Sequence, residues 1–136
     1  MEFFLKLKKA FICGNLLRKI IKLPDQLLGL LVRKLVYRRN KIVGNRIFVM
    51  TFDNKYSCNQ KYIVEEILRR KLPVEIIWTC GPRGIPQGFP SEVQLVNRGS
   101  YSMYEAQATS RIWLDNALNC VWFGMPKKKG QVYFNT

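Results

Sequence analysis

Ile47-Phe48-Val49-Met50-Thr51-Phe52 is the most informative run in this sequence. It is short and almost wholly apolar, which is typical of a strand buried on both faces of a sheet. A polar loop at 53–58 and an amphipathic helical pattern from about Asn59 to Arg70 follow it. After Pro73, a second apolar run occupies Val74–Thr79. A strand, a helix and a strand in this order predict a right-handed βαβ unit, and therefore a parallel sheet.

The same alternation continues to the end of the sequence. Ser102 and Glu105 have the spacing of a capping box, which predicts the start of a second helix. The loop Cys80–Pro90 is rich in Gly and Pro but matches no phosphate-binding motif. The later elements are expected as strands at 93–96, 111–114 and 131–134 and a helix at 102–109. The fold class is therefore α/β, with a Rossmann-like parallel sheet over residues 46–136.

Polar side chains follow two of the expected strands. Asp53, Asn54 and Ser57 come after the first, and Asp115 and Asn116 come after the fourth. Ligands of parallel α/β sheets bind beyond the carboxyl ends of the strands, so these residues are candidates for binding a hydroxylated or phosphorylated substrate. Asp, Asn and Ser are also the usual residues of loops and helix caps, so a structural role remains open for each.

The absence of histidine narrows the possible chemistry. No Ser-His-Asp or Cys-His arrangement and no histidine-based metal site can be formed. Four cysteines are dispersed without a CxxC pair, at Cys13, Cys58, Cys80 and Cys120. We expect reduced thiols in a cytosolic protein, with disulfides as the alternative. We expect no metal site, no cofactor and no catalytic residue in this sequence.

Positive charge is concentrated in residues 1–45, which we call the basic arm. The net charge of the chain is +14, and residues 1–46 hold twelve Lys and Arg against two acids. Leu16, Leu17, Ile20 and Ile21 share one helical face, and a second helix after Pro24 places four leucines on one face. The cations expected to contact a membrane are Lys6, Lys8, Lys9, Arg18, Lys19, Lys22, Arg33, Lys34, Arg38 and Arg39.

Bulky apolar residues beside cations are typical of helices that lie in the headgroup plane of an anionic membrane. We therefore expect peripheral attachment at the cytoplasmic face of the cell membrane, with no signal peptide and no membrane span. Packing of the arm on its own protein is the first alternative. Nucleic acid is not expected as a partner, because no reader motif or stacking platform is present. Lys127-Lys128-Lys129 is either a solvated turn or a surface that faces phosphate or membrane.

Two long runs, 45–78 and 96–136, resemble a known family. They contain, in order, F-D-N-K, S-C-N, R-G-S, W-L-D-N and K-K-x-G-Q-x-Y-x-N-T. This series resembles the N-terminal domain of the CDP-glycerol glycerophosphotransferases, the teichoic-acid and capsule polymerases that include ribitol-phosphate relatives. The resemblance covers about residues 45–136, and the arm resembles the membrane-binding helices of such enzymes only in kind.

The resemblance implies a GT-B-like enzyme with two Rossmann-like domains and an active site between them. The C-terminal domain would bind the CDP-activated donor, and the N-terminal domain would face a lipid-linked polyol-phosphate acceptor. The family's expected catalytic histidine lies in a W-H-G segment directly after the N-T pair, here Asn135-Thr136. We therefore expect the chain to be inactive alone, as the N-terminal portion of such an enzyme. The acceptor-side candidates are Asp53, Asn54, Ser57, Asp115 and Asn116, and the alternative function is a non-catalytic membrane-binding or docking module.

Overall fold

A computed structural model describes residues 27, 31, 34–37, 40–52, 54–81, 88–117, 120 and 127–136. The chain forms two compact units, Met1–Leu35 and Val36–Thr136. In the first unit, the helical residues Leu27, Leu31 and Leu35 are all more than half exposed. Their spacing of four residues puts them along one face of a helix. No helix in the described residues is both long enough and apolar enough to cross a membrane.

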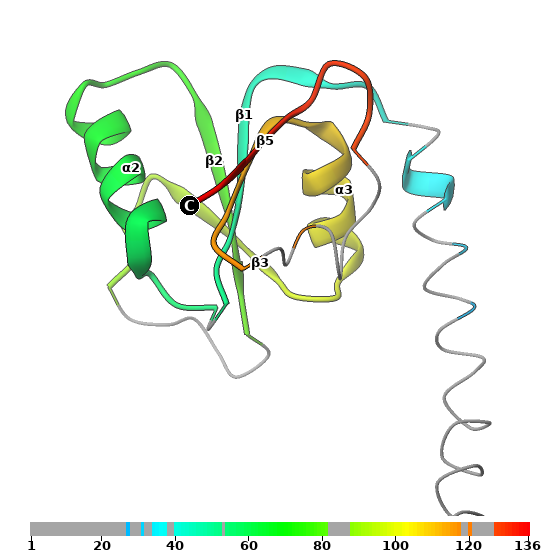
Figure 1. The fold of residues 1–136 in the computed structure, drawn as a ribbon, viewed down its shortest axis with the longest axis horizontal. Helices are drawn as coiled ribbons and strands as arrows, with labels where there is room; N and C mark the ends of the chain where they lie inside the picture. Colours follow the sequence, from blue (N-terminus) through cyan, green and yellow to red (C-terminus); the bar gives the residue numbers. More distant parts are fainter. Residues whose placement is uncertain are drawn as a thin grey trace, which may run out of the picture. The chain divides into compact units, whose positions relative to one another are not determined.

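The second unit is built on one five-stranded sheet in which every neighbouring pair of strands is parallel (Figure 1). The strand order is β3-β2-β1-β4-β5. The strands are β1 (Val43–Met50), β2 (Glu75–Cys80), β3 (Val93–Asn97), β4 (Ser110–Asp115) and β5 (Val132–Asn135). This confirms the predicted α/β class and its Rossmann-like parallel sheet. We call the ends at which the strands begin the amino edge, and the ends at which they finish the carboxyl edge.

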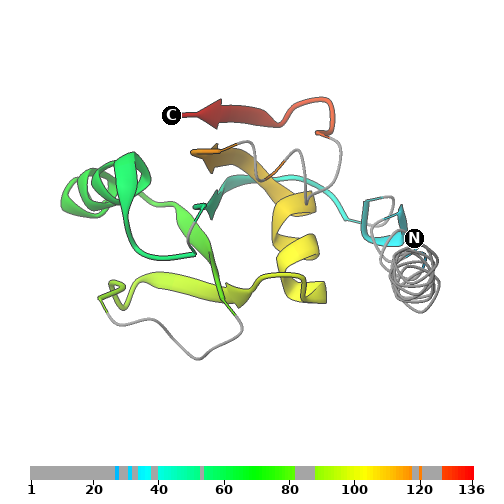
Figure 2. The ribbon, with the colours of Figure 1, turned by 60° about the horizontal axis from the view of Figure 1, so that its bottom comes forward.

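Two helices cover opposite faces of this sheet, α2 (Cys58–Arg69) and α3 (Tyr101–Thr109) (Figure 2). Alternate residues of β1 point to the two sides, as the pleat of a strand requires. Ile47 and Val49 belong to the apolar cluster that includes Val64 of α2. Phe48 and Met50 belong to the cluster that includes Met103 of α3. The continuous apolar run in the sequence thus reflects a strand buried from both sides.

The limits of β1 differ from those predicted. The strand begins earlier, at Val43, and its pairing register with β4 shifts between Val43 and Ile47. It ends at Met50, because Thr51 turns the chain instead of continuing the ladder. The Thr51 hydroxyl donates to the Lys55 carbonyl at 2.9 Å, and Phe52 is 72% exposed. The apolar character of Phe52 therefore does not indicate a strand.

The predicted capping box at the start of α3 is wrong. Ser100, not Ser102, is the N-cap, and its hydroxyl accepts a hydrogen bond from the Met103 amide at 3.2 Å. Gly99 precedes it with a φ of +81°, a conformation that glycine adopts without steric cost. The cap therefore lies two residues before the expected one and the helix begins at Tyr101, so Ser102 lies exposed in the first turn.

The two serines provide a matched test of the cap. We expect Ser100→Ala to lower the free energy of unfolding by about 1 kcal/mol, because the Met103 amide loses its acceptor. Ser102→Ala is expected to change it by less than about 0.5 kcal/mol, as for other exposed positions. Urea unfolding followed by circular dichroism measures both variants. Equal losses for the two variants would contradict the assignment of the cap.

Candidate functional site

The strand order reverses direction between β1 and β4, which makes the carboxyl edge there the topological switch point of the sheet. From β1 the chain proceeds to β2 and β3 on one side of the sheet, whereas β4 and β5 lie on the other side. The loops that follow β1 and β4 therefore lead away from each other. Parallel α/β sheets bind their ligands at such a reversal of strand order. The residues predicted from the sequence to bind substrate follow these two strands.

Asn116 links the segments that follow β1 and β4. Its side-chain carbonyl accepts a hydrogen bond from the Phe52 amide at 2.9 Å. Asn116 follows β4 and Phe52 follows β1, so one hydrogen bond links segments that are 64 residues apart in the sequence. The structure thus brings a predicted residue of the fourth strand end beside the first.

The side chain of Asn54 accepts a hydrogen bond from Arg98, which was not among the site residues predicted from the sequence. Arg98 donates from Nη1 to Asn54 Oδ1 at 3.2 Å, and its amide donates to the Cys80 carbonyl at 2.9 Å. Asn54 has a φ of 55°, a left-handed conformation that asparagine tolerates better than most residues. Arg98 therefore ties the ends of β1, β2 and β3 together. In the sequence, Arg98 is the first residue of the R-G-S motif and directly follows β3.

Asp115 is fully buried, and its carboxylate accepts hydrogen bonds from the chain itself. Oδ1 accepts from the amides of Asn116 at 2.8 Å and Ala117 at 3.3 Å. Oδ2 accepts from the Cys120 amide at 2.6 Å and from the Tyr133 hydroxyl at 3.1 Å. These donors surround the carboxylate and fix the loop after β4. The contacts correspond to the structural role that the sequence left open for this residue.

The groups around Asp115 remain protonated at neutral pH. Burial, and then the negative charge of Asp115, raises the pKa of the Cys120 thiol far above its ordinary value. The same two causes, in the same order, raise the pKa of the Tyr133 hydroxyl. Tyr133 is thus a hydrogen-bond donor to Asp115 throughout the physiological range, and Cys120 is not a thiolate nucleophile.

Ser57 lies where α2 begins, at the same edge of the sheet. It is the N-cap residue in an extended conformation, but its side chain does not cap the helix. Its Oγ lies 3.5 Å from Cys58 Sγ instead. The first amides of a helix carry partial positive charge, which favours an anion nearby. Ser57 is therefore placed at an edge suited to a phosphate group.

The Asn135-Thr136 pair is held at this edge from two sides. The Thr136 amide donates to the Asp115 carbonyl at 2.9 Å, as a continuation of the β4–β5 ladder. The Thr136 hydroxyl accepts from Gln60 Nε2 at 2.9 Å, and Gln60 is fully buried in α2. Sequence reasoning did not identify Gln60, because its partner lies 76 residues away.

Several predicted residues lie outside the described part of the chain. They are Asp53 and, from the basic arm, Lys6, Lys8, Lys9, Arg18, Lys19, Lys22, Arg33, Arg38 and Arg39. Lys34 is described and is exposed on a helical turn. Among the described cysteines, Cys80 and Cys120 are buried, Cys58 is exposed, and none is in a disulfide. The described residues contain no group of three or more Cys, Asp or Glu side chains that would hold a metal ion.

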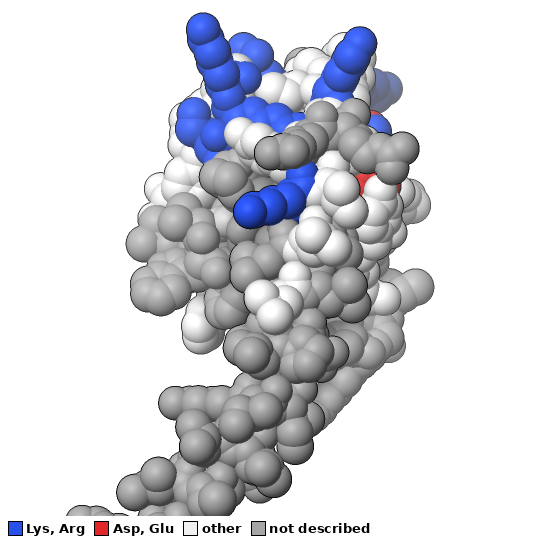
Figure 3. Space-filling model, turned by 90° about the vertical axis from the view of Figure 1, so that its right-hand side faces the viewer, with Lys and Arg blue, Asp and Glu red and all other residues white. Residues whose placement is uncertain are grey.

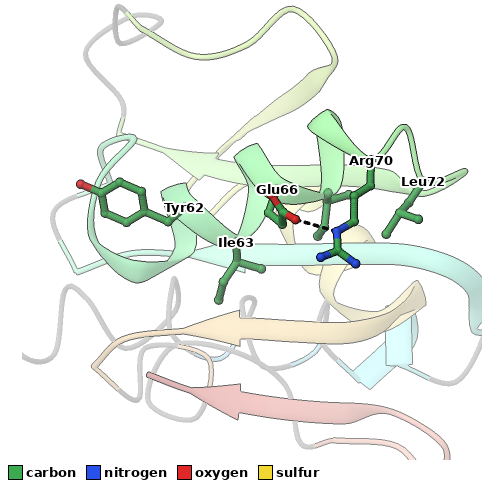
Figure 4. A pocket seen from close by; sticks show the side chains of 6 residues that line it. Tyr62, Ile63, Glu66, Arg70 and Leu72 are labelled. Carbon is green, nitrogen blue, oxygen red and sulfur yellow. Dashed lines mark hydrogen bonds and ion pairs between the residues drawn. The ribbon is translucent and has the colours of Figure 1, made fainter.

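A separate apolar groove of about 460 Å³ lies along α2 (Figure 4). Tyr62, Ile63 and Leu72 line it, and Arg70 forms an ion pair with Glu66 at its wall. None of the predicted substrate-binding residues lines this groove. The candidate site is therefore the carboxyl edge and not this groove.

Comparison with solved structures identifies similar folds. A histidine-to-asparagine variant of the wall teichoic acid polymerase TagF matches with a TM-score of 0.67 and 24% identity, over 90% of this chain and 31% of that chain. The same variant soaked for 30 minutes with CDPG gives 0.66 and 24%, over 90% and 32%. This chain thus spans about a third of the length of these proteins. At this identity the likeness shows the fold, which is GT-B-like.

Comparison with curated protein sequences gives no match. A family model does match, and it covers residues 31–136, which include the whole sheet and both of its helices. Its description is CDP-glycerol:poly(glycerophosphate) glycerophosphotransferase. The matched residues include all of the ordered motifs from F-D-N-K to N-T. The chain therefore belongs to the CDP-glycerol:poly(glycerophosphate) glycerophosphotransferase family.

Proposed function

We propose that this chain forms the acceptor-binding side of an enzyme that transfers polyol phosphate from CDP-glycerol or CDP-ribitol to a lipid-linked teichoic-acid or capsule polymer. The observation that carries the proposal is the arrangement at the carboxyl edge. A guanidinium from Arg98, the amides of Asn54 and Asn116, and the amino end of α2 gather where the strand order reverses. Cations and amide donors are the groups that bind phosphodiesters and hydroxyls.

The proposed reaction assigns a role to each side of the enzyme. The terminal hydroxyl of the acceptor attacks the phosphorus that carries the donor's polyol, a new P–O bond forms, and the bond to CMP breaks. The hydroxyl proton passes to a general base, which residues 1–136 do not supply as histidine. Within this chain, Arg98 would pair with the phosphodiester next to that hydroxyl. Asn54 and Asn116 would orient the hydroxyl, and Asp115 would act as a positioning residue.

The proposed location is the cytoplasmic face of the cell membrane. The exposed leucines Leu27, Leu31 and Leu35, with Lys34 beside them, are the kind of helical face that inserts between headgroups. A peripheral enzyme held in this way meets a lipid-linked acceptor without crossing the bilayer. The CDP-activated donor would be bound by the second Rossmann-like domain of the family. The alternative, a docking module, would bind the acceptor and take no part in transfer.

Acceptor binding by residues 1–136 tests the site without requiring turnover. We expect Arg98→Ala to weaken binding of a synthetic glycerol-phosphate oligomer about tenfold, because one charge-assisted hydrogen bond contributes roughly 1.5–3 kcal/mol. The matched control is Arg69→Ala, which removes the same charge from the far end of α2. Titration calorimetry measures both, and the control is expected to remain within about twofold of the unchanged chain.

Asn54→Ala tests the hydrogen bond that orients Arg98 separately from the positive charge of Arg98. This variant keeps the cation of Arg98 and removes its partner, so we expect a smaller loss than for Arg98→Ala. Equal weakening by Arg98→Ala and Arg69→Ala would mean that the oligomer binds to net charge alone. That result would reject the carboxyl edge as the acceptor site.

A further inference from the structure

A second group of cations lies at the opposite edge of the sheet. We call Lys41, Arg111, Lys127, Lys128 and Lys129 the amino-edge cluster. Lys41 precedes β1, Arg111 is the second residue of β4, and the three lysines precede β5. Because β1, β4 and β5 are neighbouring parallel strands, their starts lie side by side. A face on which Lys and Arg side chains gather is visible in Figure 3.

The lysine turn is held in a fixed conformation. The Lys128 amide donates to Gln131 Oε1 at 2.8 Å, and Lys127 Nζ donates to the Gln131 carbonyl at 2.9 Å. Lys128 Nζ donates to the Asn40 carbonyl at 2.6 Å and lies 5.1 Å from the centre of the Tyr37 ring. These hydrogen bonds tie the turn to Gln131 and to Asn40. Lys128 anchors it, and Lys127 and Lys129 stay exposed on either side.

The charge of this cluster is not neutralised within the described part of the chain. No carboxylate there forms an ion pair with any of its five members. Other cations of the same unit are paired: Arg46 with Glu75, and both Arg69 and Arg70 with Glu66. Arg111 lies close to the turn. A Cβ atom at Gly130 would be 3.4 Å from Arg111 Nη1. Like charges held together without counter-charges favour an external anion.

The cluster lies where the chain leaves the basic arm. Tyr37, which contacts Lys128, is two residues after Leu35, so at most about 7 Å of extended chain separates them. Because this connection is short, one membrane surface would be able to contact both the exposed leucines and the cluster. A soluble polyanion would make no use of the leucines. The carboxyl edge, at the other end of the strands, would remain open to substrate.

We propose that the amino-edge cluster binds anionic lipid headgroups, and that this second contact orients the sheet with its carboxyl edge away from the membrane surface. The inference rests on the membrane location in the proposed function and adds residues that the basic arm does not contain. Lys41, Arg111, Lys127 and Lys129 supply the electrostatic attraction. Lys128 acts as a positioning residue, because its ammonium holds the turn to Asn40.

The test compares two variants of equal charge in the full chain. The cluster variant carries Lys41→Gln, Lys127→Gln and Lys129→Gln, and the control variant carries Lys61→Gln, Arg69→Gln and Arg70→Gln on α2. Co-sedimentation with vesicles of phosphatidylcholine and phosphatidylglycerol measures the partition coefficient. Each lysine near an anionic surface contributes on the order of 1 kcal/mol, so we expect the cluster variant to bind at least tenfold more weakly. The control variant is expected to lose less than about threefold.

Further measurements separate the possible outcomes. Unfolding curves that coincide for the two variants establish that a loss of binding is not a loss of fold. Equal binding of both variants to the vesicles would overturn the inference. It would not affect the proposed acceptor site, because the titration of Arg98→Ala with the glycerol-phosphate oligomer tests that site separately. A loss by the cluster variant on soluble glycerol-phosphate polymer or duplex DNA as large as the loss on vesicles would also overturn it. The inference would also be overturned if the unchanged chain bound vesicles of phosphatidylcholine alone as tightly as the anionic vesicles.

Discussion

Replacing Asp115 by alanine is expected to lower the free energy of unfolding by about 3 kcal/mol or more. The buried amide of Cys120 and the hydroxyl of Tyr133 would lose their acceptor, as would the amides of Asn116 and Ala117. Each buried donor left without a partner costs about 1–3 kcal/mol, and relaxation of the loop recovers part of that loss. Urea unfolding followed by tryptophan fluorescence provides the measurement, since Trp113 is buried in the neighbouring core.

Two further variants make this result specific to the hydrogen bonds. Asp115→Asn keeps one oxygen as an acceptor but turns a second donor toward the Tyr133 hydroxyl or the Cys120 amide, so an intermediate loss is expected. Glu92→Ala removes an exposed carboxylate and is expected to cost less than about 0.5 kcal/mol. A loss below 1 kcal/mol for Asp115→Ala would show that the loop after β4 does not depend on this carboxylate.

The Asp115 contacts also explain what the sequence could and could not predict. Position after a strand was enough to place Asp115 and Asn116 at the carboxyl edge, since parallel strands end on the same side. Whether their side chains face a substrate or the protein depends on donors from other segments. Tyr133, for example, reaches Asp115 from β5, 18 residues later. No pattern of neighbouring residues contains that information.

The first and last residues of the strands and helices were harder to predict than their order along the chain. The apolar run 47–52 correctly indicated a strand buried on both faces, because burial depends on composition and periodicity. Its end depended on hydrogen bonds of the turn that follows, such as those from the Thr51 hydroxyl to the Lys55 carbonyl and from the Phe52 amide to Asn116. The start of α3 depended on a choice between two serines with the same chemistry, Ser100 and Ser102. The end of a strand and the cap of a helix are thus set by individual hydrogen bonds, which the pattern of apolar residues does not reveal.

Arg98 shows a different limit of sequence reasoning. A single arginine after a strand is ordinary, and its motif, R-G-S, gave its place in the chain but no partner. The structure adds the partner, Asn54, and the nearby end of β2. A basic group at the carboxyl edge changes the candidate site from a set of amides and hydroxyls to one suited to a phosphodiester.

Gln131→Ala is expected to lower the free energy of unfolding by about 2 kcal/mol, the second largest effect. Gln131 is 2% exposed, and its Nε2 donates to the carbonyls of Gln107 at 2.9 Å, Ala108 at 3.3 Å and Ser110 at 2.7 Å. These carbonyls belong to the end of α3 and the start of β4, where a helix leaves acceptors without partners. The matched control is Gln94→Ala, an exposed glutamine on β3, with an expected loss below about 0.5 kcal/mol.

Gln131→Glu tests the direction of these hydrogen bonds at nearly constant volume. A carboxylate would point oxygens at three carbonyl oxygens, so we expect a loss at least as large as for alanine. If glutamate were tolerated better than alanine, the amide would not be the donor that the geometry indicates. The alanine variant also releases the Lys128 amide from Gln131 Oε1 while keeping every charge of the amino-edge cluster. A fall in vesicle binding by the alanine variant, measured where it is still folded, would therefore report the position of the lysines and not their number.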